Sequence, residues 1–329
     1  MSAPLRVWLI TDEKPGHKNQ LKGLAQSLGR LTPVDISWIG TDKLDVHWWQ
    51  LINRKKLSAI QQAVSKLNTN QTAESNVEAA APDIVIGAGH ATHKALVALK
   101  KVYHSFSVVL MKPSLPYRFF DAAVIPSHDS PPERPDILST QGVLNVVRPN
   151  TGPRTEDGLM LIGGISKHYD WSTARVLDSI ISIVEKDLRH WHLTNSRRTP
   201  EDFMSSLQAR LNQLKLSDRA TLWPHQDTPS SWLPEQLKSA NRVWVTPDSV
   251  SMVYEALTSS APTGIIELTP SRQGRIVRGI DNLITDKKLS TVSSWLKSGV
   301  ICPPAKNFCE ADKAANWLLE KYATHHKIT

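Results

Sequence analysis

A stretch near residue 248 combines a predicted strand end with side chains that could bind a nucleotide. The apolar run 243–245 predicts a strand that stops at Thr246-Pro247, because proline cannot continue a central ladder. Asp248 or Ser249 can then cap a helix with helical spacing of its apolar positions. The start of that helix favours a phosphate, and Glu255, in its first two turns, could accept hydrogen bonds from a ribose. An ordinary capped helix with a solvated glutamate fits the same pattern.

A second polar turn, residues 12–20, follows the first predicted strand, residues 5–11. Pro15-Gly16 allows a sharp change of direction in this turn. His17 is the candidate general base there, because imidazole titrates near neutral pH. A histidine that only hydrogen-bonds the following helix is the alternative.

Further strand ends in the first half carry polar or glycine-bearing turns. Gly87-Ala88-Gly89-His90 follows the predicted strand 83–86, and its glycines would let the backbone approach a ligand, without the third glycine of a dinucleotide motif. Residues 143–147 are expected to form the last strand of this half. Because the carboxyl ends of parallel strands share one edge of a sheet, that edge should collect five side chains: His17, His90, Lys112, His128 and Asp129. Plain loop solvation is the alternative for Lys112 and His128.

The second half contains two more turns that suit an anion. Gly163-Gly164-Ile165-Ser166-Lys167 follows the predicted strand 159–162 and could wrap a diphosphate with its N–H groups, while Lys167 neutralises charge. Ser196-Arg197-Arg198 follows the predicted strand 192–194 and could clamp an oxyanion. Arg275 could face the same site. Exposed arginines without a ligand are the alternative for all three arginines.

The alternation of strands and helices predicts the elements that hold these turns. It is typical of doubly wound parallel sheets, whose ligands lie at the carboxyl edge of the strands. Residues 149–157, rich in proline, glycine and charge, read as a linker. We therefore expect an α/β protein with a domain over residues 1–150, a second over residues 151–305, and a final helix within 306–329 that packs back on the first domain.

Composition narrows the class of protein. The 329 residues, 40% of them hydrophobic, are typical of a globular chain of two domains. The net charge of +8 suits nucleotide phosphates or anionic lipid headgroups, and no nucleic-acid-binding module is recognised, so we predict no nucleic acid partner. Two separate cysteines, Cys302 and Cys309, argue against a disulfide framework or structural zinc, and a reducing cytosol fits.

Membrane association is predicted only at a surface. The sequence shows no signal peptide and no apolar run of spanning length. Residues 45–57 combine paired tryptophans with a basic end, which suits a helix on an anionic membrane, while tryptophans packed into the domain are the alternative. The expected location is cytoplasmic, with peripheral attachment to the inner membrane as an open option.

The motifs in this order resemble the mitochondrial-fission "elongated mitochondria" family, whose bacterial members are assigned as glycosyltransferases. The resemblance spans nearly the whole chain, and one departure is Gly89-His90, where many relatives would carry an arginine. The matching segments include residues 11–20, 87–90, 110–116, 126–129, 161–168, 196–199 and 246–252.

The family in turn looks like the GT-B glycosyltransferases, in which two Rossmann-like domains face each other across a cleft. It is most similar to the enzymes that add N-acetylglucosamine to the lipid-linked peptidoglycan precursor. The resemblance implies that Gly16-His17 lies on the acceptor side, that Gly163-Gly164 covers a diphosphate, and that Glu255 binds the ribose. It also implies a nucleotide-diphosphate sugar as donor, no further cofactor and no metal, in agreement with the missing Asp-x-Asp motif.

These inferences give two predicted sets of site residues besides the catalytic His17. The nucleotide-sugar set consists of Gly163, Gly164, Ser166, Lys167, Ser196, Arg197, Arg198, Asp248, Ser249, Ser251, Glu255 and Arg275. The acceptor-side set consists of Gly16, Asn19, Gln20, Gly89, His90, Lys112, His128 and Asp129.

The predicted function is metal-independent transfer of a sugar from a nucleotide-diphosphate sugar to a lipid-linked or cell-envelope acceptor. Two other classes stay open. One is a non-enzymatic adaptor that keeps the fold and binds a protein, as the fission role of the plant member implies. The other is a nucleotide-sugar epimerase, which uses a similar site and no acceptor.

Overall fold

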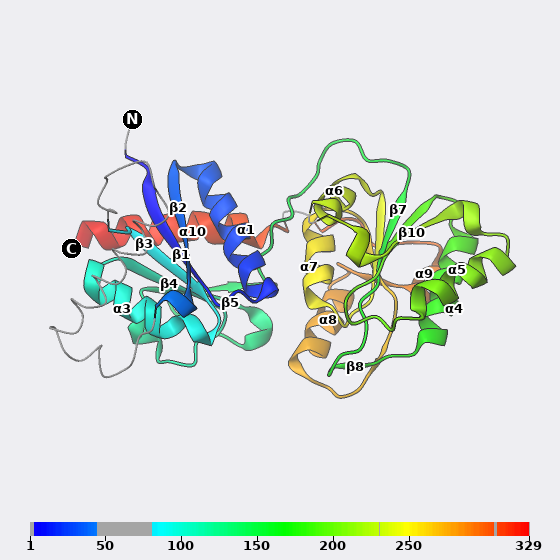
Figure 1. The fold of residues 1–329 in the computed structure, drawn as a ribbon, viewed down its shortest axis with the longest axis horizontal. Coiled ribbons are helices and arrows are strands. Elements are labelled where there is room, and N and C mark those ends of the chain that lie inside the picture. The colour runs from blue at the N-terminus through cyan, green and yellow to red at the C-terminus, as the bar shows by residue number, and fades with distance from the viewer. Residues whose placement is uncertain (1–2, 45–80, 230, 306–307, 329) are drawn as a thin grey trace. The chain divides into compact units, whose positions relative to one another are not determined.

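The apolar segments of the chain form two six-stranded parallel sheets in a computed structural model (Figure 1). The structure describes residues 3–44, 81–229, 231–305 and 308–328. The tryptophan-rich segment 45–57 therefore lies outside the described residues, and its prediction stays open. The chain divides into two compact units, the first comprising residues 1–146 and 310–329 and the second residues 147–309.

The sheet of the first unit has the strand order β2-β1-β3-β4-β5-β6. Its first five positions repeat the 2-1-3-4-5 order of flavodoxin-like folds, with the reversal of direction between β1 and β3. The strands are β1 (Leu5–Thr11), β2 (Val34–Gly40), β3 (Ile84–Ala88), β4 (Phe106–Leu110), β5 (Ala122–Pro126) and β6 (Ile137–Thr140).

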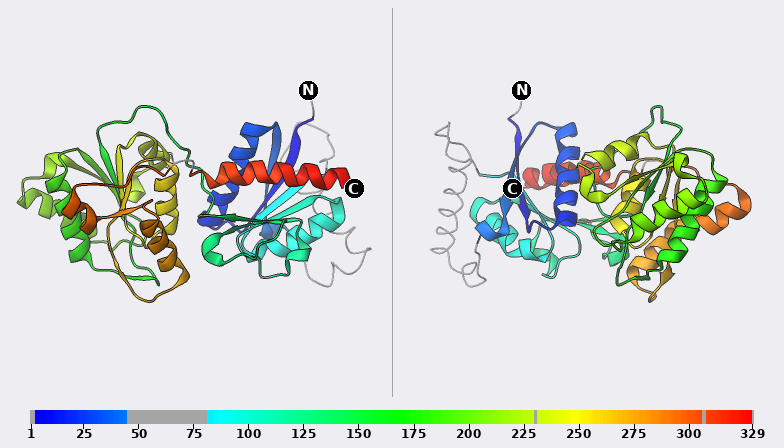
Figure 2. Two further views of the ribbon diagram at one scale, coloured as in Figure 1. Left: turned by 180° about the vertical axis from the view of Figure 1, so that it is seen from behind. Right: turned by 45° about the vertical axis from the view of Figure 1, so that its right-hand side comes forward.

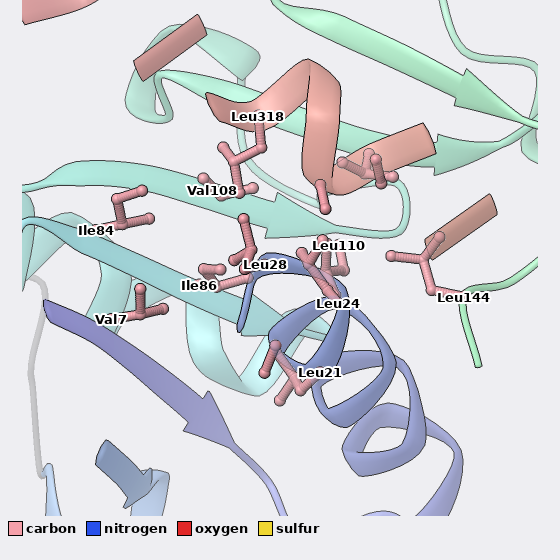
Figure 3. Close-up of a cluster of buried hydrophobic side chains, with 14 of the residues drawn as sticks. Val7, Leu21, Leu24, Leu28, Ile84, Ile86, Val108, Leu110, Leu144 and Leu318 are labelled. Atoms are coloured by element: carbon pink, nitrogen blue, oxygen red, sulfur yellow. The ribbon is translucent and has the colours of Figure 1, made fainter. Parts of the chain in front are cut away.

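Among the described residues, three helices cover this sheet: α1 (Pro15–Leu31), α3 (His93–Tyr103) and α10 (Glu310–Ile328). Helices α1 and α10 lie on one face of the sheet, and α3 lies on the other (Figure 2). Side chains of α1 and α10 share one buried cluster with the sheet, and those of α3 share a second. On the first face Leu21, Leu24 and Leu28, which recur at helical spacing, pack against alternate strand residues such as Ile84 and Ile86 (Figure 3). The terminal helix is thus part of the first core, and its Leu318 completes the cluster.

The predicted strand over residues 143–147 is wrong, because the last strand of the first sheet is β6. Leu144 and Val147 are buried without pairing in the sheet. The segment packs on α1 instead, where the carbonyl of Asn145 takes the space that a side chain on Gly23 would need. Its apolar pattern reflects burial against a helix, which alternation alone cannot distinguish from a strand.

The second sheet has the order β10-β9-β7-β11-β12-β14, which is the 3-2-1-4-5-6 order of the Rossmann fold. Its reversal lies between β7 and β11. The strands are β7 (Gly158–Leu161), β9 (Trp191–Thr194), β10 (Ala220–Trp223), β11 (Arg242–Val245), β12 (Thr263–Ile265) and β14 (Ser290–Thr291). A separate antiparallel pair joins β8 (Tyr169–Asp170) to β13 (Thr269–Pro270).

Within the part of this unit that the structure describes, six helices flank the sheet: α4 (Thr173–Lys186), α5 (Phe203–Gln213), α6 (Trp232–Ser239), α7 (Val250–Thr258), α8 (Arg275–Thr285) and α9 (Val292–Ser298). α4, α5 and α9 share a core with Trp191 and Trp244, and α6, α7 and α8 lie toward the opposite face (Figure 1). The predicted fold class, α/β with two Rossmann-like domains, is confirmed.

Candidate functional site

The reversal point of the first sheet holds a carboxylate–imidazole pair. Asp12 follows β1, and His17 lies in the first turn of α1, which proline opens at its first position. The Oδ1 atom of Asp12 lies 2.8 Å from Nδ1 of His17, and the two side chains are 6% and 16% exposed. A carboxylate only accepts hydrogen bonds, so Nδ1 carries the proton and Nε2 of a neutral imidazole is left as an acceptor. This is the tautomer that a general base requires.

Gly89 positions this imidazole from the neighbouring strand. It follows β3 with a φ of 83°, a conformation that favours glycine. A Cβ at this position would come closer than 3.0 Å to the His17 ring. The missing side chain therefore lets the imidazole lie directly against the end of β3, and the structure brings these two predicted site residues together.

Asp12 stays ionised in this setting. Burial raises the pKa of its carboxyl group, but hydrogen bonds from His17 and Lys14 outweigh burial, so that the net pKa is lowered. Nζ of Lys14 lies 3.2 Å from Oδ2. A charged Asp12 is what orients His17 and stabilises its protonated form.

The backbone at the same edge is held in unusual conformations. Glu13 has a φ of 61° and Met111 a φ of 72°, and neither is a glycine. Each follows a strand end after which predicted site residues lie, and such strain is concentrated at functional positions. The Nε2 atom of Gln20 lies 3.2 Å from Sδ of Met111, so this predicted site residue contacts the Met111 side chain.

The remaining acceptor-side predictions form separate contacts or face solvent. Nζ of Lys112 donates to the carbonyl of Asp129 at 3.2 Å and ties the turns after β4 and β5 together. His90 is exposed at the start of the turn before α3. The other three are Gly16, which is exposed with open space around it, and the half-buried Asn19 and His128.

The reversal point of the second sheet joins three turns through one buried carboxylate. The Oδ2 atom of Asp248 accepts the N–H of Gly164 at 2.9 Å and lies 2.9 Å from Nη2 of Arg198. The N–H of Gly163 donates to Oγ1 of Thr246 at 2.7 Å. The carboxylate is fully buried, whereas the Arg198 side chain is 42% exposed. The ends of β7, β9 and β11 are thereby fixed to one another.

These hydrogen bonds change the expected role of the two glycines. Their N–H groups are used inside the domain, and the next one, of Ile165, donates to the carbonyl of Arg198 at 3.0 Å. A Cβ on Gly163 would overlap the Asp248 carboxylate, and one on Gly164 would overlap the backbone of Arg198. The glycines permit close contact between turns here, rather than the diphosphate cradle of N–H groups that the sequence suggested. Their place beside a nucleotide stays a prediction.

Asp248 also differs from its expected role as a helix cap, because its side chain turns back to Gly164. Ser249 is the N-cap residue of α7, and no side chain caps the helix. The first turn of α7 contains no acidic residue. The leading N–H groups of a nine-residue helix are therefore offered to an anion without competition from a carboxylate of the same turn.

Neighbouring arginines have different surroundings at this edge. Arg198 binds Asp248, and its Nη1 atom donates to the carbonyl of Ile165 at 3.0 Å. Arg197 is exposed, and within the described part of the chain its guanidinium makes no hydrogen bond or ion pair. Lys167 is exposed as well, two residues beyond Ile165. The structure therefore assigns Arg198 to holding the turns and leaves Arg197 and Lys167 open to solvent.

The other predicted nucleotide-side residues lie in the turns after β7 and β9 and at helices α7 and α8. Glu255 is 9% exposed in the second turn of α7. Ser166 accepts the N–H groups of His168 and Tyr169, and Ser196 accepts that of Arg198. The last three are Ser249, which is half-buried, Ser251, which is exposed, and Arg275, which begins α8 and is exposed.

Several polar residues at these two sheet edges were not among the residues predicted from the sequence. Asp12 lies only five residues before His17, and the spacing at a strand end was the available signal. Thr199 reaches the carbonyl of Gly163 with its hydroxyl group. His93 is buried, with Nδ1 3.2 Å from Oγ of Ser114, and burial followed by the charge of His90 lowers its pKa to about 4.

The described residues contain no group of three or more His, Cys, Asp or Glu side chains arranged to hold a metal ion. Among the same residues, the helices are all too short or too polar to span a membrane.

Comparison with known proteins assigns the family. The model of the family described as Mitochondrial fission ELM1 matches residues 15–322. This chain belongs to that family. A protein named Uncharacterized protein RP120, from Rickettsia prowazekii (strain Madrid E), is 28% identical over 130 residues. That match spans 38% of this chain and 32% of the Rickettsia protein, so it covers about a third of the relative's length.

Solved structures with the same fold come from nucleotide-sugar enzymes. A Listeria monocytogenes protein assigned as a UDP-N-acetylglucosamine 2-epimerase has a TM-score of 0.59 at 13% identity, covering 99% of this chain and 98% of its own. The UDP-GlcNAc 2-epimerase from Methanocaldococcus jannaschii has a TM-score of 0.55 at 12% identity, covering 97% of this chain and 100% of its own. At these identities the likeness establishes the two-domain fold alone.

Proposed function

We propose that this member of the ELM1 family is a glycosyltransferase that moves a sugar from a nucleotide-diphosphate sugar to an acceptor hydroxyl group. The observation that carries the proposal is the Asp12–His17 pair at the reversal point of the first sheet. Ligands of open α/β sheets bind at this position. A buried carboxylate that fixes the tautomer of a partly exposed imidazole is suited to proton transfer from a substrate.

The proposed step uses His17 as the general base. Nε2 of His17 takes the proton of the acceptor hydroxyl group, whose oxygen then forms a bond to the anomeric carbon of the sugar. The bond from that carbon to the diphosphate breaks, and the nucleoside diphosphate leaves with the electron pair. Asp12 stabilises the imidazolium that forms, because it stays charged 2.8 Å away.

The second unit supplies the donor site in this proposal. The diphosphate binds at the start of α7, where N–H groups and the helix dipole favour negative charge. Arg197 and Lys167 add positive charge, and Glu255 binds the ribose. Such groups can stabilise a leaving diphosphate without a metal ion, so we propose a metal-independent reaction.

The acceptor is proposed to be lipid-linked or part of the cell envelope. The support is the resemblance to enzymes that act on the peptidoglycan precursor and the net charge of +8, which suits an anionic headgroup or an anionic membrane surface. The proposed location is accordingly cytoplasmic, with peripheral attachment to the inner membrane.

A panel of nucleotide sugars, incubated with membrane lipid extract and followed by mass spectrometry of the products, tests the proposal. We expect a glycosylated lipid and a released nucleoside diphosphate. His17→Ala should reduce transfer about 100-fold or more and leave nucleotide binding intact, whereas Glu255→Ala should weaken binding. His104→Asn is the matched control, because this exposed histidine has a φ of 55°, which asparagine tolerates.

Each other class of function gives a different result in this assay. An epimerase would convert the free nucleotide sugar without an acceptor. An adaptor would bind no nucleotide, and thermal unfolding would then show no shift with any of them, although a ligand at 100 times its dissociation constant adds about 2.7 kcal/mol. Equal loss of binding and transfer in His17→Ala would assign His17 a structural role.

A further inference from the structure

The segment through which the chain enters the second unit, residues 147–157, is here called the connecting segment. In it Thr151, Gly152 and Pro153 are exposed, and so are Thr155 and Glu156, but the Arg154 side chain between them is turned inward and half-buried. Figure 1 shows this part of the chain passing α6 before it reaches β7. A cation turned into the protein from an otherwise exposed stretch requires acceptors there.

Arg154 finds these acceptors at the carboxyl ends of two helices. Nη1 donates to the carbonyl of Ala240 at 2.8 Å and, at 3.3 Å each, to those of Leu237 and Lys238 at the end of α6. Nη2 donates to the carbonyl of Ser259, which ends α7. Nη2 also reaches the carbonyl of Asn150 at 3.1 Å, within the connecting segment itself.

All five acceptors are carbonyl groups, and four of them lie at the carboxyl ends of α6 and α7. The attraction therefore comes mainly from the negative ends of the helix dipoles and not from a carboxylate. The pKa of Arg154 is lowered by burial, which is the result expected for a cation whose partners are neutral. Two neighbours strengthen the same contact. Asn150 donates its N–H to the carbonyl of Ser259 at 3.2 Å and its side-chain amide to that of Lys238 at 2.7 Å, and Thr155 donates its N–H to the carbonyl of Ser239 at 2.9 Å.

We infer that Arg154 is a positioning residue for the nucleotide site, and that a nucleotide bound at the start of α7 in turn holds the connecting segment in place. The inference rests on the proposed function, because it takes the start of α7 as the phosphate site. α7 is nine residues long, about 14 Å at 1.5 Å per residue. Arg154 fixes its far end, so the axial position and tilt of the leading N–H groups depend on this guanidinium.

Calorimetric titration of three variants tests whether Arg154 positions the nucleotide site. The ligand is whichever of uridine diphosphate and guanosine diphosphate binds the full-length wild-type protein. Arg154→Met should raise the dissociation constant about tenfold, within the usual range for coupled sites. Arg154→Lys keeps the charge but cannot reach five carbonyls, so its affinity should be intermediate. Arg219→Met is the matched control: Arg219 also donates to a backbone carbonyl, that of Asp187, away from α7.

Limited trypsin digestion tests whether bound nucleotide holds the connecting segment in place, because trypsin cuts after Arg154 itself. Saturating nucleotide should slow cleavage between Arg154 and Thr155 in the wild-type protein by the same factor of about ten, since coupling between two equilibria is reciprocal. Arg154→Lys retains a cleavable bond and should be cut faster than the wild-type protein. If the side chain mattered only for stability, nucleotide would protect this bond no more than it protects other trypsin sites of the second unit.

Two results would overturn the inference while the proposed function stands: equal affinities in wild type and Arg154→Met, or cleavage that nucleotide leaves unchanged. If Arg154→Met does not fold, Arg154→Lys and the wild-type digestion decide the question. Failure of the wild-type protein to bind any nucleotide removes the proposed donor site, and the inference falls with it.

Discussion

Arg197 and Arg198 are adjacent in sequence, but the structure predicts opposite effects when each is replaced by alanine. Arg198 is the ionic partner of a fully buried carboxylate, that of Asp248, whereas Arg197 is exposed. In Arg198→Ala, Oδ2 of Asp248 would lose the guanidinium and keep the hydrogen bond from the N–H of Gly164. A buried charge that loses its partner is costly, so the variant should be less stable than the wild-type protein.

The size of the stability loss in Arg198→Ala depends on how exposed the two side chains of the ion pair are. Breaking a buried ion pair costs 3–5 kcal/mol, but Arg198 is 42% exposed and water can replace part of its contact. A charge-assisted hydrogen bond contributes about 1.5–3 kcal/mol, and we therefore expect a loss of about 2 kcal/mol. For a unit of this size that corresponds to a fall in melting temperature of roughly 4–8 °C. Arg197→Ala should stay within about 0.5 kcal/mol of the wild-type protein.

Calorimetric unfolding and nucleotide titration of both variants separate the two roles. Arg197→Ala should weaken nucleotide binding at unchanged melting temperature, and Arg198→Ala should lower the melting temperature. The double variant Arg198→Ala with Asp248→Asn is the control, because it removes the buried charge together with its partner and should recover part of the stability. Equal melting temperatures for the two single variants, or no recovery in the double variant, would refute the assignment of Arg198 to Asp248.

Two further predictions concern the first unit. Gly23→Ala should destabilise the protein by about 1–3 kcal/mol in chemical denaturation, because its Cβ would overlap the carbonyl of Asn145. Gly29→Ala on the same helix should be neutral or stabilising, since its Cβ would meet only a methyl group of Val34 at 3.4 Å; equal effects of the two would contradict this packing. The pKa of His93 falls from 6.5 to about 4 on folding, so below pH 6.5 the unfolded chain binds a proton that the folded protein rejects. Stability should therefore fall between pH 6.5 and 4, by on the order of 3 kcal/mol, and a His93→Gln variant that loses as much over this window would exclude His93 as the cause.

Local patterns identified most of the strands and the edge at which the polar turns lie. Apolar runs that end in glycine, proline or polar residues identify strand ends, and the alternation with helices makes the sheets parallel. This reasoning places Ser249 at the start of α7, as observed. It places His17 in a polar turn after β1, whereas α1 already begins at Pro15 and His17 lies in its first turn. It fails for residues 143–147, where burial against α1 produces the same apolar pattern as a strand.

The contacts within the sites could not be read in the same way, because they join segments far apart in the sequence. Asp248 and Gly164 are 84 residues apart. Nothing in the local sequence shows that the N–H groups of the glycine turn are satisfied by Thr246 and Asp248, or that Gly89 accommodates the His17 ring. Glycine pairs after a strand permit close approach of either a ligand or another turn, and only the tertiary structure distinguishes the two.

The two reversal points share one arrangement and differ in its basic side chain. In each, a buried aspartate holds a basic side chain at the carboxyl edge of the sheet: Asp12 holds His17, and Asp248 holds Arg198. Imidazole changes its charge near neutral pH, whereas a guanidinium does not. The first pair can therefore exchange a proton with a substrate, and the second can only fix structure and charge. This difference, rather than the shared fold, is the reason for proposing the base in the first unit. The start of α7, with Arg197 and Lys167, is the reason for proposing the anionic donor in the second.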